Sequence, residues 1–333
     1  MHAVSEASSW LQYIVSDAIR VIVNDIIAET AQGIADMTIR GAGRIARAGA
    51  SALGEFADAY TGTDPEDFKR DLSEASRRIL DSRPTAVSLW NAVHATVRGV
   101  DSARSVSDIK ALVRANADEF CFRSEKAVER IATIGAKRIE DGDTVMTHCN
   151  SSAAIGILRE AHRQGKEFRV FATESRPWRQ GILTVRELSA AGIDTTLIID
   201  SAVRTVMRDA DKVFVGADTI TSHGALINKV GTSQLALAAN EARVQFYVCA
   251  ETYKFSPMTL FGDMVTIEER DIAEIIRPGE IPGEVKVFNP VFDSTPAHYI
   301  DAIITELGMI SPGSVYDVMV RQLGETIFEL EEF

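Results

Sequence analysis

Cysteine, lysine and long apolar runs are all scarce in this 333-residue sequence. The three cysteines, Cys121, Cys149 and Cys249, form no CxxC pair and no metal-ligand spacing, which argues against a disulfide framework and a zinc site. No apolar run approaches the roughly 18 to 20 residues that cross a bilayer, and the N-terminus lacks a basic secretory segment. P-loop, HExxH and GxSxG motifs are absent as well. We therefore expect a cytoplasmic protein without a membrane partner, metal or cofactor.

Basic residues are also few: the sequence has 35 Lys and Arg and 48 Asp and Glu, which gives a net charge of −13. This sign disfavours binding to the backbone of a nucleic acid. Only nine of the basic residues are lysine. An acidic, lysine-poor surface suits a protein that must stay soluble in a high-salt cytoplasm, which predicts a halophilic host and loss of structure at low salt.

The length suits two domains, and the composition, 46% apolar and 25% charged, is typical of a globular protein. In the first part of the chain, apolar side chains recur every three or four residues, which indicates amphipathic helices. These are predicted over about 10–34, 42–60, 66–80, 85–99 and 105–139. No strand signal occurs before residue 143, so residues 1–120 are predicted to form an all-helical N-terminal domain.

The remaining residues, 121–333, alternate short β-branched runs with helical stretches. Strands are predicted over 144–148, 168–172, 195–199, 213–217 and 245–250. This alternation predicts right-handed crossovers and therefore an α/β domain with a Rossmann-like, doubly wound parallel sheet. Ligands bind such sheets beyond the carboxyl ends of the strands. The residues that follow the predicted strands are His148 to Asn150, Glu174 to Arg176, Asp200, Asp218 and Glu251 to Lys254.

Two of these residues could transfer protons. Cys149 precedes good N-cap residues for a helix that runs to about Gln164, and a helix N-terminus lowers the pKa of a thiol. A small buried residue at a strand end would give the same pattern. Asp218 follows the predicted strand 213–217 at the same edge of the sheet, so the thiol and the carboxylate could act as a pair in proton transfer. Alternatively, Asp218 could only form hydrogen bonds within the following loop.

Cations and amides at that edge come from Asn228, Lys229 and Lys254, although a lone lysine after a strand is usually solvated surface. In the helical part, Gly41 to Ala46 fits GxGxxA, but no strand precedes it, which excludes a dinucleotide fingerprint.

An anion site in the helical part is an alternative to close helix packing. The glycine-rich stretch that begins at Arg40 opens a helix, so its free amides could hold a phosphate. Arg83 stands before Pro84 in a helix break, from which its guanidinium could reach the same anion in bidentate fashion. An isolated arginine there would otherwise be surface.

Taken together, eight motifs resemble a known superfamily over nearly the whole chain. It joins the alpha, beta and delta regulatory subunits of the eukaryotic nucleotide-exchange initiation factor, factor 2B, to two sugar-phosphate isomerase families. Within it the sequence is most similar to the archaeal ribose-1,5-bisphosphate isomerases. The motifs are Arg40-Gly-Ala-Gly, Ser82-Arg-Pro-Thr-Ala-Val-Ser-Leu, Thr147-His-Cys-Asn-Ser, Glu174-Ser-Arg-Pro, Gly216-Ala-Asp, Ile227-Asn-Lys-Val-Gly-Thr, Tyr253-Lys-Phe and Asn289-Pro-Val-Phe-Asp-Ser-Thr-Pro.

The resemblance implies conversion of ribose 1,5-bisphosphate to ribulose 1,5-bisphosphate in the archaeal degradation of nucleoside monophosphates such as AMP. It implies Cys149 as proton acceptor and Asp218 as proton donor, with no metal. It also implies a homohexamer built as a trimer of dimers, and a nucleoside monophosphate as activator. The substrate contacts that it implies are Arg40, Gly41, Ala42, Gly43, Arg83, Asn228, Lys229 and Lys254.

Two alternatives stay open at this point. A methylthioribose-1-phosphate isomerase would run the same reaction on a monophosphate, and the Arg40 stretch favours the bisphosphate instead. A non-catalytic regulatory subunit of the initiation factor would bind a partner protein and need not keep Cys149 and Asp218, whose presence counts against it.

Overall fold

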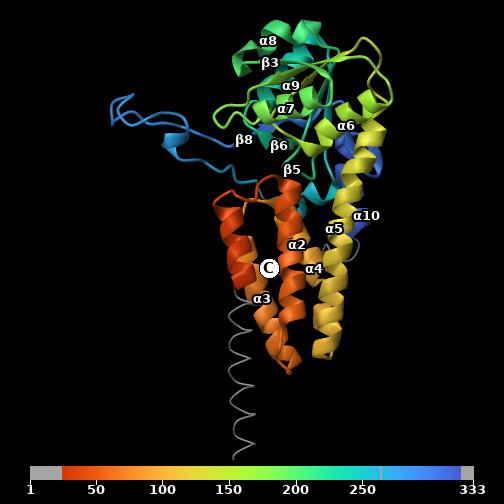
Figure 1. Ribbon diagram of the computed structural model, residues 1–333, viewed down its shortest axis with the longest axis vertical. Coiled ribbons are helices and arrows are strands. Elements are labelled where there is room, and N and C mark those ends of the chain that lie inside the picture. The colour runs from red at the N-terminus through yellow and green to blue at the C-terminus, as the bar shows by residue number, and fades with distance from the viewer. Residues whose placement is uncertain (1–24, 263–264, 324–333) are drawn as a thin grey trace, which may run out of the picture. The chain divides into compact units, whose positions relative to one another are not determined.

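A computed structural model describes residues 25–262 and 265–323 (Figure 1). The chain divides into two compact units, Met1–Glu125 and Lys126–Phe333. The first is called the helical unit below and the second the α/β unit. Within the described ranges, no helix has both the length and the apolar character that crossing a membrane requires.

The helical unit follows the predicted helices closely. A helix covers residues 25–35, and the part of the predicted first helix that precedes residue 25 lies outside the described residues. It is followed by α2 (Ala42–Ala59), α3 (Pro65–Asp81), α4 (Val87–Val97), the short 3-10 turn η1 (Val100–Ser102) and α5 (Val106–Ala136), whose last turns belong to the α/β unit.

Local chemistry and apolar packing account for these helices. The Asp64 carboxylate caps α3 by accepting from the amides of Glu66 and Asp67, at 2.8 and 2.9 Å, and Pro65 starts the helix with its fixed φ. Phe68 then enters the core and stacks on Tyr60 with 3.9 Å between ring centroids. Periodic apolar residues therefore bury one stripe of each helix, which is the main stabilisation of such a unit.

The α/β unit contains a seven-stranded sheet in the order β10-β9-β7-β4-β1-β2-β3. Every neighbouring pair is parallel except β9 with β10. The five predicted strands are confirmed, whereas β9 and β10 had no prediction. The strands are β1 (Thr144–Thr147), β2 (Arg169–Thr173), β3 (Asp194–Ile198), β4 (Lys212–Val215), β7 (Gln245–Cys249), β9 (Ala302–Thr305) and β10 (Gly308–Ile310).

Helices cover both faces of this sheet, and alternate residues of each strand enter opposite cores. Val213 and Val215 of β4 pack in one buried cluster, while Phe214 packs in the other. The first cluster involves α8 (Val203–Val206), α9 (Thr232–Ala242) and α10 (Val315–Leu323), and the second involves α6 (Ser152–Arg163), α7 (Gly181–Ala190) and the end of α5. This is the expected doubly wound α/β architecture.

A second, antiparallel sheet has no counterpart in the sequence prediction. Its order is β5-β6-β8, with β5 (Thr219–Ile220), β6 (Leu226–Lys229) and β8 (Phe292–Thr295). These strands are only two to four residues long, too short for a clear alternation of apolar and polar side chains. Because β5 follows β4 directly, this sheet begins at the carboxyl edge of the main sheet, where ligands bind in such folds.

Short 3-10 turns complete the α/β unit. They are η2 (Asp200–Ala202), η3 (Met207–Asp209), η4 (Thr252–Lys254), η5 (Pro257–Phe261), η6 (Ile272–Glu274), η7 (Ala297–Tyr299) and η8 (Pro312–Ser314).

Candidate active site

The predicted proton-transfer residues follow two adjacent strands. Strand β1 lies between β4 and β2, so Cys149 comes just after a central strand and Asp218 just after its neighbour. Gly216 permits this approach, since a Cβ there would lie 2.4 Å from Ser151 Oγ, at the start of α6. Both side chains are half-buried.

The backbone of Cys149 is held in a conformation that is rare for a residue with a side chain. Its φ is +64°, in the left-handed region, where a non-glycine residue costs roughly 1 to 2 kcal/mol. Hydrogen bonds on both sides maintain it: the Cys149 amide donates to Ser175 Oγ at 2.8 Å, and the Thr184 hydroxyl donates to the Cys149 carbonyl at 2.6 Å. Hydrogen bonds from neighbouring elements thus fix the backbone position from which the Cys149 side chain extends, as is common at active sites.

His148 anchors the same turn from inside the fold. Its Nε2 faces the Val230 carbonyl at 2.9 Å and must therefore donate to it. Burial lowers the pKa of His148, so the ring is neutral and its Nδ1 accepts from the Thr173 hydroxyl at 2.6 Å. Thr173 Oγ1 lies 3.2 Å from Ser175 Oγ, which joins this chain of bonds to Cys149.

Asp200 fixes the loop that carries Ser175. Its carboxylate accepts from the amides of Ser175 and Arg176 at 2.8 and 2.7 Å. Ser175 itself has φ +61°, so this loop is a second point of backbone strain beside the thiol.

Asn228 and Lys229 reach the site from β6. The Asp218 amide donates to the Ile227 carbonyl at 3.1 Å, which joins the end of β4 to this strand. The Lys229 ammonium lies 5.2 Å from the ring centroid of Phe292 on β8, a cation–π arrangement. Asn228 is buried and donates to Thr232 Oγ1 at 3.0 Å.

The electrostatics of the thiol show which charges surround it. Burial raises the pKa of the Cys149 thiol to about 11, and the carboxylates of Asp218 and Asp200 act in the same direction. The Lys229 ammonium and the Asn150 amide lower this pKa but do not offset the lost hydration. The prediction that the helix N-terminus leaves Cys149 with a lowered pKa is therefore wrong, because desolvation is the larger effect.

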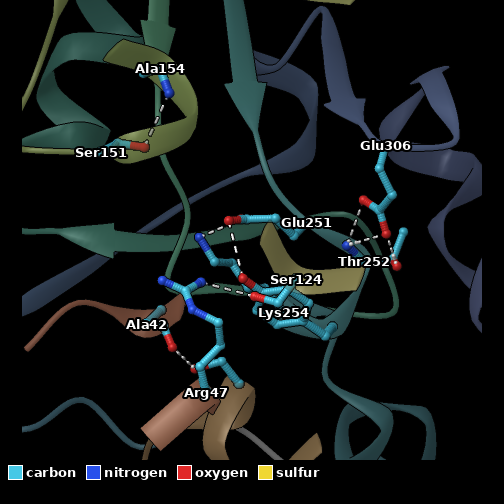
Figure 2. A network of polar contacts seen from close by, with 11 residues as sticks. Ala42, Arg47, Ser124, Ser151, Ala154, Glu251, Thr252, Lys254 and Glu306 are labelled. Carbon is cyan, nitrogen blue, oxygen red and sulfur yellow. Dashed lines mark hydrogen bonds and ion pairs between the residues drawn. The ribbon is translucent and has the colours of Figure 1, made fainter. Parts of the chain in front are cut away.

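Lys254 has a different environment within the same unit. It lies in η4, after β7, and its ammonium is 2.6 Å from the Glu251 carboxylate in a buried ion pair (Figure 2). Beside this pair, the Thr252 amide donates to Glu306, which follows β9. Burial raises the pKa of the Cys249 thiol, the Glu251 carboxylate raises it further, and the Lys254 ammonium lowers it by less. Cys249 is thus a core residue, as its apolar strand indicates.

The remaining predicted contacts belong to the helical unit. Gly41 has φ +93° and caps α2, a conformation that favours glycine. The Ser88 hydroxyl on α4 donates to the Ala42 carbonyl at 3.0 Å. The stretch from Arg40 to Gly43 and the break around Arg83, just before α4, therefore lie at the same end of this unit.

Two residues that hold the turn at Cys149 had no role predicted from the sequence. Thr173 ends β2 and Thr184 lies in α7, and only their hydrogen bonds in the folded unit show their involvement. Asp293 lies in the motif that begins at Asn289, but no role was predicted for it from the sequence. Among the described residues, no group of three His, Cys, Asp or Glu side chains is arranged to hold a metal ion.

Comparison with known proteins agrees with this architecture. Residues 38–312 match the Initiation factor 2 subunit family. Ribose 1,5-bisphosphate isomerase of Archaeoglobus fulgidus is 52% identical over 306 residues, covering 92% of this chain and 96% of that protein. Among solved structures, translation initiation factor eIF-2B of Pyrococcus horikoshii OT3 is 36% identical with a TM-score of 0.75, covering 86% of this chain and 97% of that chain.

A second solved structure, 5-methylthioribose 1-phosphate isomerase of Pyrococcus horikoshii OT3, is 30% identical with a TM-score of 0.71, covering 91% of this chain and 88% of that chain. The residues matched to the family include the whole polar network around Cys149. The chain therefore belongs to the initiation factor 2 subunit family.

Proposed function

We propose that this chain is an aldose–ketose isomerase that converts ribose 1,5-bisphosphate to ribulose 1,5-bisphosphate. The observation that carries the proposal is the half-buried thiol of Cys149, held in a left-handed turn, whose pKa responds to both Asp218 and Lys229. A base, an acid and a cation at one strand edge are the groups that this chemistry needs. The 52% identical relative with that name supports the choice of substrate.

The reaction moves two protons, and the two side chains divide them. Cys149 takes the proton from C2 of the sugar and returns it to C1. Asp218 donates a proton to the ring oxygen as the ring opens and takes one from the C2 hydroxyl as the ketone forms. The cycle starts from the Cys149 thiolate and the protonated Asp218 carboxyl, a pair that forms when the thiol proton passes to the Asp218 carboxylate. Both groups end in these states, and no external oxidant or reductant is required.

The raised pKa of Cys149 determines how much thiolate is present and how strong a base it is. At neutral pH the free protein holds mostly the thiol, so the thiolate is scarce. Once formed, however, a thiolate of high pKa is a strong base towards a carbon-bound proton. The nearby Lys229 ammonium stabilises the thiolate and would also attract a phosphate of the substrate.

The two phosphates need cations, which are few in this acidic chain. Asn228, Lys229 and Lys254 are the proposed contacts in the α/β unit. In the helical unit the proposed contacts are the stretch from Arg40 through Gly41, Ala42 and Gly43, and Arg83. The free amides at the start of α2 suit an anion, and a guanidinium can bind phosphate in bidentate fashion.

A methylthioribose-1-phosphate isomerase is the second candidate, because a solved protein of that name shares the fold at 30% identity. The same Cys149 and Asp218 chemistry would serve it. The difference lies in the second phosphate, which that substrate lacks. Replacing Arg83 by Leu should therefore raise the KM for the bisphosphate more than that for methylthioribose 1-phosphate.

The deciding experiment incubates the purified protein with each sugar phosphate and follows substrate and product by mass-balanced chromatography. Conversion of ribose 1,5-bisphosphate to the ketose, with little conversion of methylthioribose 1-phosphate, is the expected result. Preference for the methylthio sugar would replace the proposal by the second candidate. Conversion of neither substrate would favour a non-catalytic, initiation-factor-like role.

Features of the cellular setting complete the proposal. They are a place in archaeal nucleoside monophosphate degradation, activation by a nucleoside monophosphate, a homohexamer assembled as a trimer of dimers, and a high-salt cytoplasm. Sedimentation across a range of KCl concentrations, with and without AMP, tests assembly and salt requirement together. A monomer at all concentrations, or full stability in dilute buffer, would remove the corresponding feature.

A further inference from the structure

The turn after β6, residues 230–231, is held by three hydrogen bonds from two segments, the one around β8 and the one that follows β1. The Val230 amide donates to the Val291 carbonyl at 3.0 Å, and the Val230 carbonyl accepts from His148 Nε2 at 2.9 Å. The Gly231 amide donates to the Asp293 carboxylate at 2.7 Å. This turn connects Lys229, whose charge acts on the Cys149 thiol, to α9, so its geometry sets where that charge lies.

Asp293 makes the strongest of these contacts. It lies in β8 opposite Asn228, and the preceding Phe292 lies opposite Lys229 and supports the ammonium with its ring. Its carboxylate also accepts from the Ser233 amide, with both oxygens at 3.1 Å, and thereby caps α9. The charge favours the positive end of the helix dipole. One carboxylate therefore ties together β8, the turn and the start of α9.

The position of Asp293 destabilises the ionised form of its carboxyl group relative to water. Burial raises the pKa of Asp293 to about 6, although the amides of Ser233 and Gly231 act to lower it. The ionisable groups on neighbouring elements are Lys229 on β6 and His148, whose ring approaches Gly231, and the first turn of α9 carries no acidic residue. A charge retained against desolvation, next to the residues that follow Lys229, is typical of a functional site.

We propose that Asp293 is a positioning residue that holds Lys229 beside Cys149 and thereby sets the affinity for a phosphate of the substrate. The proposal rests on the isomerase function proposed above. The ionised carboxylate accepts from both amides, whereas a protonated one binds them more weakly. Substrate affinity should therefore fall as the pH drops through about 6. Sugar phosphates lose their second proton near pH 6 as well, but that contribution is the same for every variant.

The test compares Asp293→Asn with a matched control, Asp301→Asn. The Asp301 carboxylate also accepts from a main-chain amide, that of Phe246 at 2.7 Å, but at the start of β7, the opposite end from the site. An asparagine at 293 keeps one acceptor oxygen, so one of the two amides, of Gly231 or Ser233, loses its partner while the other keeps it.

We expect Asp293→Asn to raise KM about tenfold with kcat within twofold, and Asp301→Asn to change neither. Between pH 5 and 7 the wild-type KM should depend on pH more steeply than that of Asp293→Asn, because the variant keeps only the titration of the substrate. The melting temperature of Asp293→Asn at pH 7.5 should stay near that of the wild type, since the lost hydrogen bond is offset by removal of a buried charge.

An unchanged KM, or parallel pH profiles of KM in the wild type and Asp293→Asn, would overturn the inference while the isomerase function stands. A wild-type protein that does not convert the bisphosphate would overturn the function itself, so the two failures are distinguishable. If Asp293→Asn does not fold, Asp293→Ser, which keeps an uncharged side-chain oxygen at this position of β8, carries the same measurements.

Discussion

The helical unit and the α/β unit differ in whether they bury charged groups. In the described part of the helical unit each ion pair has at least one exposed partner, as in Arg70 with Asp67 and Arg114 with Asp118. The α/β unit instead buries a neutral histidine, His148, and the Lys254–Glu251 pair near the carboxyl ends of its strands.

This difference means that the two units are stabilised in different ways. Exposed ion pairs contribute little, so the helical unit depends on apolar packing. Buried polar groups must be fully bonded to be tolerated, which makes the strand edge of the α/β unit rigid and specific. The α/β unit is thus where we expect substitutions to change chemistry, and the helical core is where we expect them to change stability.

The largest expected effect is on turnover. Cys149→Ser and Asp218→Asn should each lower kcat roughly a thousandfold or more, because each removes a proton-transfer group. Circular dichroism spectra should match that of the wild type. Cys121→Ser, which changes a cysteine of the helical unit, is the control and should stay within about twofold of the wild-type rate. Near-normal turnover in either site variant would show that the residue is not catalytic.

In the helical unit, Phe68→Ala should lower the free energy of unfolding by about 3 to 5 kcal/mol, since Phe68 is fully buried and leaves a cavity. Chemical denaturation measures this change. Phe122→Ala is the matched control: Phe122 lies in the same unit but is 59% exposed, so its effect should be within about 0.5 kcal/mol. Equal losses in the two variants would mean that apolar burial does not dominate there.

Thiol reactivity probes the polar edge of the α/β unit. Because burial raises its pKa to about 11, Cys149 should react with iodoacetamide at pH 8 roughly a hundredfold more slowly than free cysteine, and its rate should still increase above pH 9. Lys229→Met should slow the reaction further, and Asp218→Asn should accelerate it. Mass spectrometry of the Cys149 peptide gives the rates. Changes of the opposite sign would contradict the arrangement of charges described here.

The smallest expected effect concerns a helix cap. Asp64→Ala should lower the free energy of unfolding by about 1 kcal/mol, because two amides at the start of α3 lose their acceptor. Glu74→Ala, a change of another acidic residue exposed on the same helix, should have almost no effect. Thermal unfolding of both variants provides the comparison, and a larger loss for Glu74→Ala would remove the capping explanation.

The helical unit was largely predictable because its signals are local. Periodic apolar residues and caps such as Asp64 depend on neighbours in the chain, so the predicted and observed helices agree within a few residues. The position of Cys149 and Asp218 after two strands of the main sheet was predictable for a similar reason, since each directly follows a strong strand pattern. Strands β5, β6 and β8 were missed because their few residues carry no clear period.

By itself the sequence determined the described helices of the helical unit, five parallel strands of the main sheet and the residue types available for proton transfer. Only the tertiary structure decided the state of those residues. The thiol pKa rises rather than falls, because burial depends on what packs around Cys149 and not on its place before a helix. The role of Asp293 likewise follows from strand pairing between distant segments, which no local pattern records.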